Sequence, residues 1–234
     1  MKVAVLDSGI LSTHEELNGK ISKSFNAINS SEEIVDDYGH GTNIAGILSA
    51  KKNGIGIIGI NQDISLLDVK VLDSEGNGEI NDIIQGLIWA YDNDVDIINM
   101  SFGFSNNYIE LEETINFLTS EGIIIIAAAG NRLGQEVDFP ARYPNVISVG
   151  SIKESGEVDV LSSSGKIDAF GPGTNIYTTD KNGGYETVRG TSFATAFITG
   201  AIARGIIEKE INQSDNPLDE SLDYLKKMGL TQIY

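Results

Sequence analysis

The sequence predicts an α/β fold of three layers around a doubly wound, mainly parallel sheet. Short runs that are apolar on both faces are typical of parallel strands covered by helices on each side. Helical patterns separate these runs, and strands that alternate with helices form right-handed βαβ units. The five strand candidates are Lys2–Leu6, Leu66–Val71, Ile97–Met100, Gly122–Ala127 and Val146–Val149.

Five helical patterns complete the prediction. They cover Thr42–Ala50, Ile80–Asp92, Ile109–Glu121, Thr191–Glu208 and Leu218–Met228. No repeat, low-complexity tract or linker divides the chain, so we expect residues 1–234 to form a single domain. Ligands of such sheets bind beyond the carboxyl ends of the strands, so functional residues should directly follow strands.

The charge balance narrows the classes of partner. The 234 residues include 34 acidic and 16 basic side chains, which gives a formal net charge of −18. A chain this acidic repels nucleic acid and anionic lipid, and we expect neither a nucleic acid nor a membrane among its partners. Cysteine is absent, which excludes disulfides, zinc–thiolate sites and a thiol nucleophile.

The first residues of the chain bear on its localisation. The stretch "MKVAVLDSG" reads as a strand and lacks the charged, apolar and small-residue regions of a secretory leader. No apolar segment approaches the roughly 20 residues that a membrane span needs. We therefore expect a cytoplasmic protein; the alternative is a secreted protein whose leader has been removed.

Two candidate residues accompany the first strand and the first helix. Asp7 directly follows the first strand, where it could belong to a site or cap a turn. His40 lies between two glycines at a helix start, where backbone and ligand can approach closely and a neutral imidazole can act as a general base. A buried, hydrogen-bonded histidine is the alternative. The other histidine, His14, is expected in a surface or turn position.

Two further candidates follow the fourth strand and open a helix. Asn131 ends "IIIIAAAGN", where its amide could donate to a developing oxyanion or simply adopt a turn conformation. Ser192 follows "GT" at the start of a helix. Its hydroxyl could cap the helix, or it could attack a carbonyl carbon while the free N–H groups of the helix stabilise the negative charge.

The motifs around these residues resemble the subtilisin-like serine protease family (subtilases). The resemblance covers Val3 to Gly205 and rests on "VAVLDSGI", "HGTNIAGILSA", "INMSFG", "AAAGN" and "GTSFATAFITGAIA". Asp, then His, then Ser is also the chain order of subtilisin. The resemblance implies a bacterial serine endopeptidase that needs no cofactor for its chemistry. In it Ser192 is the nucleophile, His40 the general base and acid, Asp7 the residue that orients the imidazole, and Asn131 an oxyanion donor.

The chain departs from the family pattern in several places. The stretch "FATAF", from Phe193 to Phe197, stands where the family has Met-Ala-Ser-Pro-His, and Asn43 replaces a second histidine. Asp7 comes early, so the predicted domain is short at its N-terminus. Glu16 and Asn53 align with side-chain ligands of the family's calcium site, and a structural calcium ion is left open.

The resemblance also implies that a peptide or protein substrate adds as a strand between two segments. One segment is the edge loop 74–78 and the other is the "SFG" stretch. The expected substrate-binding residues are Gly76, Gly78, Ser101, Phe102 and Gly103.

Asp138 aligns with the floor of the pocket for P1, the substrate residue before the cleaved bond. A carboxylate without a partner in a partly dry pocket favours Arg or Lys at P1, unless the loop shifts and Asp138 faces water. Neighbouring acids should favour the same substrates: Asp36, Asp37, Asp73, Glu75 and Glu79.

The family contains two groups of short acidic members, which are intracellular subtilisins and leader peptidases of bacteriocins (lantibiotics). Some of the leader peptidases cut after Arg, so a precursor peptide cut after Arg or Lys is the expected partner. A catalytically impaired binding or regulatory module is the alternative function.

Overall fold

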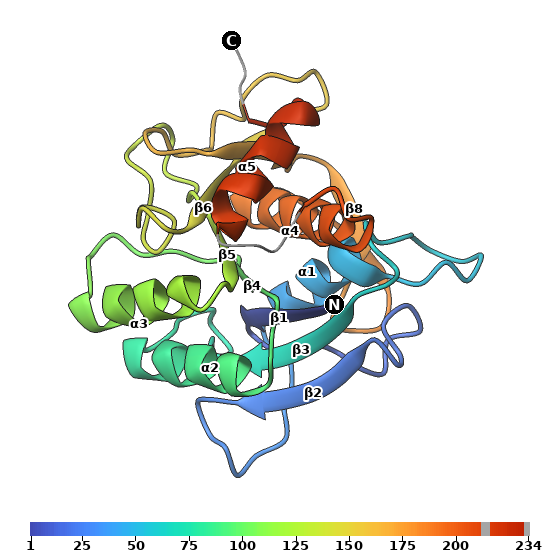
Figure 1. Ribbon diagram of the computed structural model, residues 1–234. Helices are drawn as coiled ribbons and strands as arrows, with labels where there is room; N and C mark the ends of the chain where they lie inside the picture. The colour runs from blue at the N-terminus through green and yellow to red at the C-terminus, as the bar shows by residue number, and fades with distance from the viewer. Residues whose placement is uncertain (212–215, 232–234) are drawn as a thin grey trace.

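The computed structural model describes residues 1–211 and 216–231, and its centre is a seven-stranded sheet in which every paired neighbour is parallel (Figure 1). The strand order is β2-β3-β1-β4-β5-β6-β7, and β8 and β9 form a separate antiparallel hairpin. The strands are β1 (Lys2–Asp7), β2 (Ile21–Asn26), β3 (Ser65–Lys70), β4 (Ile97–Met100), β5 (Ile124–Ala128), β6 (Ile147–Ile152), β7 (Ala169–Pro172), β8 (Ile176–Thr179) and β9 (Tyr185–Val188).

Helices cover both faces of the sheet, which confirms the predicted α/β class with three layers (Figure 1). The helices are α1 (His40–Ser49), α2 (Ile80–Asp92), α3 (Ile109–Ser120), α4 (Thr191–Ile207) and α5 (Pro217–Lys227). On one face α1 packs beside α4, and α5 packs on α4; on the other face α2 packs beside α3. In the described ranges, we find no helix that combines the length and the apolar character needed to cross a membrane.

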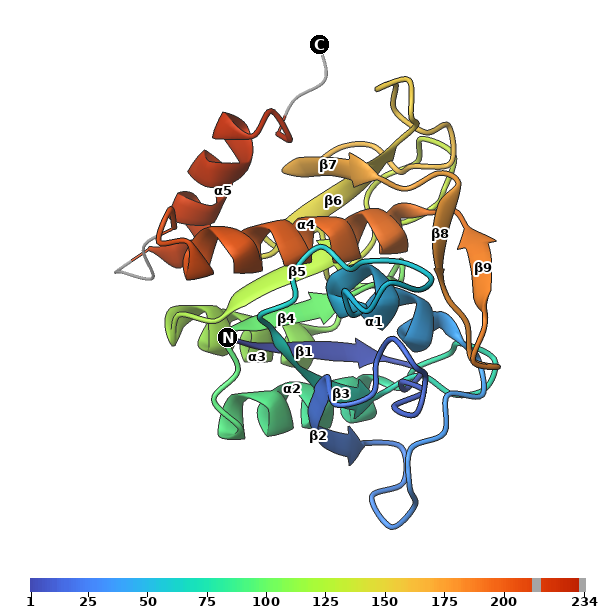
Figure 2. The same ribbon diagram turned by 90° about the vertical axis from the view of Figure 1, so that its right-hand side faces the viewer.

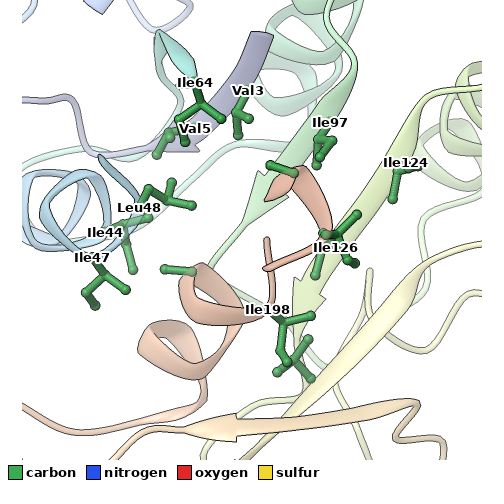
Figure 3. Close-up of a cluster of buried hydrophobic side chains, with 14 of the residues drawn as sticks. Val3, Val5, Ile44, Ile47, Leu48, Ile64, Ile97, Ile124, Ile126 and Ile198 are labelled. Carbon is green, nitrogen blue, oxygen red and sulfur yellow. The ribbon is translucent and has the colours of Figure 1, made fainter. Parts of the chain in front are cut away.

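The alternation of side chains along β1 explains why the strand is apolar throughout. Val3 and Val5 point into the core under α1 and α4, whereas Ala4 and Leu6 point into the core under α2 and α3. All four side chains are fully buried. Figure 3 shows the first of these cores, in which Val3 and Val5 of β1 lie near Ile64, and Ile198 of α4 lies near Ile126 of β5.

Four strands were not predicted from the sequence. β2 is an edge strand whose central residues are exposed, so it lacks the continuous apolar run of a covered strand. Its one large aromatic residue, Phe25, stacks on Trp89 of α2 with ring centroids 5.3 Å apart. β7, β8 and β9 have four residues each, which is too short for a periodic pattern to stand out.

The order of the strands places a site at the carboxyl edge of the sheet. β1 is flanked by β3 on one side and β4 on the other, so the direction of winding reverses there. Asp7 is the last residue of β1, and Ser101 directly follows β4. In Figure 2 the β8–β9 hairpin stands at this same edge, toward which the strand arrows point.

Candidate active site

The Asp7–His40 pair forms where the end of β1 meets the start of α1. His40 Nδ1 lies 2.8 Å from Asp7 Oδ1 and 3.0 Å from Oδ2. Asp7 is fully buried, and the His40 side chain is 16% exposed. A buried carboxylate that accepts Nδ1–H leaves Nε2 of the imidazole unprotonated and able to accept a proton.

Asp36 holds the loop that carries His40, a role that sequence reasoning missed. It is buried, not free to line the groove, so its expected place among the groove acids is corrected. Its Oδ1 accepts from Ser8 Oγ and Gly39 N–H, both at 2.7 Å, and its Oδ2 accepts from Thr42 N–H at 3.0 Å. A buried carboxylate needs several donors to offset its lost hydration, and those donors come from the residue after β1 and from the start of α1. The Asp-Asp pair before "YGHGT" was the only available sequence signal.

The pKa of His40 reflects its surroundings. Burial disfavours the charged imidazolium, but the charge and hydrogen bond of Asp7, aided by the charge of Asp36, outweigh that effect and raise the pKa of His40. The Phe193 ring lies 5.5 Å from the imidazole, and Tyr38 lies on another side at 6.2 Å. Phe193, the first residue of the "FATAF" stretch in which the chain departs from the family, thus forms one wall of the pocket around His40.

Ser192 is the second residue of α4 and lies beside the end of β4. Its Oγ donates to the Ser101 carbonyl oxygen at 2.6 Å. Ser101 Oγ in turn donates to the Ser192 carbonyl oxygen at 2.9 Å. Because a hydroxyl has one proton, Ser192 must rotate before it can donate to His40, a rearrangement often completed only when substrate binds.

A buried polar chain positions Ser101 against α4. Thr199 Oγ1 donates to Asn99 Oδ1 and Asn99 Nδ2 donates to Ser101 Oγ, both at 2.9 Å. All three side chains are buried. The chain fixes the spacing between β4 and α4, and hence the distance from Ser101 to Ser192. Sequence reasoning missed Asn99 and Thr199 because they read as ordinary members of a strand and a helix.

The Asn131 side chain is oriented by the first residue of α4. Thr191 N–H donates to Asn131 Oδ1 at 2.9 Å, so Nδ2 is the donor that remains available. A Cβ on Gly190 would meet that Nδ2 at 3.0 Å, and Gly190 has a φ of 146°. Thr191 itself is buried and accepts from Gly130 N–H through Oγ1 at 3.2 Å. The amide nitrogen of Asn131 thus lies beside Gly190, two residues before Ser192, and Asn131 is exposed.

The segment that carries Asp138 is hydrogen-bonded to the residues that follow β4 and β5. Asp138 N–H donates to Ala129 O at 3.0 Å, and the next N–H, of Phe139, donates to Phe104 O at 2.9 Å. A Cβ on Gly103 would lie 2.8 Å from Asp138 Cβ, and one on Gly130 would lie 2.4 Å from Asp138 Oδ2. Asp138 is buried between these two glycines, so the alternative in which it faces water is wrong.

The Asp138 carboxylate already has a partner. Arg132 Nη1 lies 2.8 Å from Asp138 Oδ1. The preference for Arg or Lys was expected on the premise of an unpaired acid, and that premise is wrong for the free protein. Arg132 was missed because it lies in the loop after Asn131, where a basic residue reads as a solvated side chain.

The two segments expected to bind substrate lie on either side of a hollow of about 200 Å³. Gly76 and Gly78 line it from the edge loop, and Phe102 and Gly103 line it from the opposite side. Ser101 lies beside Ser192 instead, as described above. A Cβ on Gly76 would meet the Tyr38 ring at 2.7 Å, so Tyr38 supports the edge loop. Of the expected groove acids, Asp37, Glu75 and Glu79 are exposed and Asp73 is partly buried.

The loop expected to hold calcium is closed by hydrogen bonds. Glu16 is buried, and its Oε1 accepts from Ile57 N–H at 3.1 Å and from the Tyr185 hydroxyl at 2.9 Å. Oε2 of Glu16 is buried and has no hydrogen-bond partner among the described residues, which would suit a cation. Asn53, however, is exposed, and its Oδ1 accepts from Ile55 N–H at 3.1 Å. Donors that face the carboxylate and an engaged amide do not fit the oxygen cage that calcium needs.

His14 is buried in a turn, so its expected surface position is wrong and its expected turn position is confirmed. Its Nδ1 accepts from Glu16 N–H at 3.1 Å, and its Nε2 lies 2.9 Å from Gly184 O. The ring also packs edge-on against Tyr185, with centroids 5.6 Å apart. The β8–β9 hairpin supplies the contacts from Gly184 and Tyr185, which the residues next to His14 in the sequence could not indicate.

Comparisons with known proteins show what the whole chain is similar to. The family model described as "Subtilase family" matches residues 1–216. The chain belongs to the subtilase family. Subtilisin E of Bacillus subtilis (strain 168) is 40% identical over 208 residues, which cover 87% of this chain and 54% of that protein. Subtilisin Savinase of Lederbergia lenta is 38% identical over 204 residues, covering 87% and 75%.

Solved structures also support the assignment of the chain to the subtilase family. Sphericase superimposes with a TM-score of 0.86 at 29% identity, covering 96% of this chain and 82% of the other. A cold adapted subtilisin-like serine proteinase gives a TM-score of 0.84 at 28% identity, covering 94% and 79%. The resemblance inferred from the motifs is thereby confirmed. The chain spans about half the length of the first curated relatives it matches.

Proposed function

We propose that this subtilase is a serine endopeptidase that hydrolyses peptide bonds of a peptide or protein. The observation that carries the proposal is the joining of Asp7, His40, Ser192 and Asn131 at one edge of the sheet by the contacts between β1, β4, β5, α1 and α4. The family match and the 40% identity to a subtilisin support the same reaction.

In the proposed mechanism Ser192 Oγ turns from the Ser101 carbonyl and attacks the substrate carbonyl carbon. His40 Nε2 takes the hydroxyl proton while Nδ1–H remains bound to Asp7, whose charge stabilises the imidazolium. The carbonyl oxygen becomes an oxyanion that accepts from Asn131 Nδ2 and from Ser192 N–H, which lies in the first turn of α4 where N–H groups lack partners within the helix.

The intermediate then collapses and the peptide C–N bond breaks. His40 gives its proton to the leaving amine nitrogen, and the acyl group stays on Ser192 Oγ. A water molecule then attacks the carbonyl carbon of this ester, and His40 accepts the proton of the water. As the ester bond breaks, His40 gives a proton to Ser192 Oγ. The carboxylic acid product leaves, and the serine hydroxyl is restored.

We propose further that the P1 residue is basic, as in a precursor peptide cut after Arg or Lys. Asp138 supports this choice because its buried carboxylate lies between Gly103, in the segment expected to bind substrate, and Gly130, which directly precedes Asn131. A guanidinium or ammonium group that reaches this carboxylate would meet a group already stripped of most of its water.

Hydrolysis of matched peptides tests both proposals. Peptides with Arg, Lys, Leu or Phe at P1 and the same flanking residues are incubated with the wild type, Ser192→Ala and His40→Ala. We expect cleavage by the wild type alone, fastest after Arg and Lys. Equal rates for all four peptides would overturn the basic preference, and absence of cleavage by folded wild type would overturn the protease proposal in favour of a binding or regulatory module.

We also propose that the Glu16 loop needs no calcium. The Ile57 N–H and the Tyr185 hydroxyl occupy one carboxylate oxygen of Glu16, and Asn53 closes its own turn. Hydrogen bonds from this chain thus take the place that a cation would have in holding the loop.

A further inference from the structure

Arg132 is held to Asp138 by a single ion pair. In the described part of the chain its side chain makes one polar contact, from Nη1 to Asp138 Oδ1 at 2.8 Å. The Arg132 side chain is 37% exposed, whereas the Asp138 side chain is 11% exposed. An arginine that is bound at one point and reaches solvent can leave its partner at small cost.

Arg142, the next arginine along the chain, is held by more contacts than Arg132. Arg142 Nε donates to Val137 O at 2.7 Å, its Nη1 lies 3.0 Å from Glu136, and its guanidinium carbon lies 4.7 Å from the centre of the Phe139 ring. Three contacts of different kinds fix Arg142 as part of the segment that carries Asp138. Among the described residues, Arg132 has no carbonyl or aromatic ring of this kind to hold it beside its carboxylate.

Because the Asp138 carboxylate is buried, it needs a cation beside it during substrate binding. The carboxylate lies between two glycines and is buried, so it is costly to leave unpaired when a substrate excludes the remaining water. If Arg132 were absent, an uncharged P1 side chain would exclude the water and leave the Asp138 carboxylate unpaired. A basic P1 side chain would instead supply its own cation, and would compete with Arg132 for the same oxygen.

We propose that Arg132 is a specificity-determining residue that pairs with Asp138 while the P1 pocket holds an uncharged side chain and withdraws to solvent when P1 is basic. The inference rests on the proposed protease function and deepens it. Arg132 lowers the penalty for uncharged P1 residues and raises the penalty for basic ones. It therefore broadens the range of peptides that are cut.

The test compares kcat/KM for two peptides that differ only in Arg or Leu at P1. Arg132→Ala removes the internal cation, and Arg132→Gln removes the charge while retaining most of the side chain. Arg204→Ala is the matched control, because it changes the net charge equally and lies at the far end of α4, where Arg204 pairs with Glu208. Asp138→Asn, alone and combined with Arg132→Ala, removes the carboxylate.

We expect the Arg-to-Leu ratio of kcat/KM to rise about tenfold or more in both Arg132 variants, mainly through KM for the Arg peptide. The ratio should not change in Arg204→Ala, and Arg132→Ala should have no effect in the Asp138→Asn background. A ratio that is unchanged or lower in folded Arg132 variants would overturn the inference.

The outcomes separate this inference from the proposed function. If wild type cuts after Arg in preference to Leu and the Arg132 variants do not change the ratio, only the role of Arg132 fails. If wild type, Arg132→Ala and Asp138→Asn all share one ratio, the basic pocket fails as well. If none of the folded proteins cuts any peptide, the protease proposal itself fails.

Discussion

At the scale of single residues, the Asp7–His40 contact depends on a close approach that only glycine permits. A Cβ on Gly41 would lie 2.1 Å from Gly9 O and 3.2 Å from Asp7 Cβ. Any larger residue would push the first turn of α1 away from the end of β1, and with it His40. Gly41, the glycine after the histidine in "GHGT", is therefore needed for the packing of α1 against the end of β1. The sequence alone suggested only that a close approach is possible there.

The pH profile of kcat/KM should report the pKa of His40. The imidazole must be neutral to accept the proton of Ser192, and Asp7 and Asp36 raise its pKa above the ordinary 6.5. Activity should thus fall as the pH drops through a value above 6.5. Asp36→Asn should move this limb to lower pH, because one negative charge near the imidazole is removed. A limb at or below 6.5 in the wild type would contradict the assignment.

Asn131 should contribute to kcat and little to KM. Asn131→Ala removes the Nδ2 donor, which binds the oxyanion of the transition state more strongly than the carbonyl of the substrate. Removal of such an asparagine from a subtilisin lowers kcat by about 10²–10³, and we expect a similar loss here. Steady-state kinetics on an Arg peptide provides the measurement. A variant that lost affinity but kept kcat would show that Asn131 only shapes the groove.

At the scale of elements, the β8–β9 hairpin ties the start of the chain to the segment before Ser192. Tyr185 of β9 donates to Glu16, and Gly184 contacts His14. Asn43 of α1 donates to Thr179 O at 2.8 Å and to Glu186 at 2.9 Å, so the residue that replaces the family's second histidine joins the same hairpin. Burial and the carboxylates of Glu16 and Glu15 raise the pKa of Tyr185, which keeps its hydroxyl a donor.

Tyr185→Phe should lower the free energy of unfolding by about 1–3 kcal/mol, because Glu16 is buried and loses a donor. Calcium or a chelator should change the melting temperature of the wild type by little. Glu15→Gln is the control, since Glu15 is exposed and its loss leaves the Glu16 bond in place. A large calcium-dependent stabilisation that disappears in Glu16→Gln would show that the loop binds the ion.

The helices and covered strands could be predicted because each has a continuous pattern. The predicted strand Ile97–Met100 is found at those bounds, and the predicted helix Ile80–Asp92 is too. The edge strand β2 could not be predicted, because half of it faces solvent and its sequence is polar. The hairpin contacts of His14 join residues about 170 positions apart, which no local pattern can indicate.

At the scale of the whole molecule, one buried acid makes stability depend on pH. Asp68 of β3 is 3% exposed, and its Oδ2 accepts from Ile10 N–H at 3.3 Å. Its Oδ1 is buried and finds no hydrogen-bond partner in the part of the chain that the structure describes. Burial raises the pKa of Asp68 to about 8, with the nearby charge of Asp36 adding to the effect. The native state thus keeps a proton that the unfolded chain releases near pH 4.

The sign of the resulting pH dependence follows from linkage. Between about pH 4 and pH 8 the native state binds more protons than the unfolded state, so the contribution of Asp68 to the free energy of unfolding falls as the pH rises. Asp68→Asn removes the ionisable group, so the increase in the free energy of unfolding that this substitution brings should be about 3–4 kcal/mol larger at pH 8 than at pH 5. Urea unfolding at both pH values measures this difference, and equal effects of the substitution would contradict it.

Part of the candidate site could be predicted because its residues, like the helices and covered strands, have a local sequence pattern. Asp7, His40, Asn131 and Ser192 each stand in a distinctive local motif at a strand end or helix start. The residues that position them do not. Asn99, Thr199 and Arg132 act through contacts between elements, so their roles appear only when β4, α4 and the loop after β5 are brought together.

The central claim is that the fold makes Ser192 a nucleophile activated by His40. Labelling with a fluorophosphonate probe, read by intact mass, tests it most directly. We predict one label per chain on Ser192, no label in Ser192→Ala, and strongly slowed labelling in His40→Ala. Absence of labelling in a folded wild-type sample, or labelling that persists in Ser192→Ala, would contradict the account.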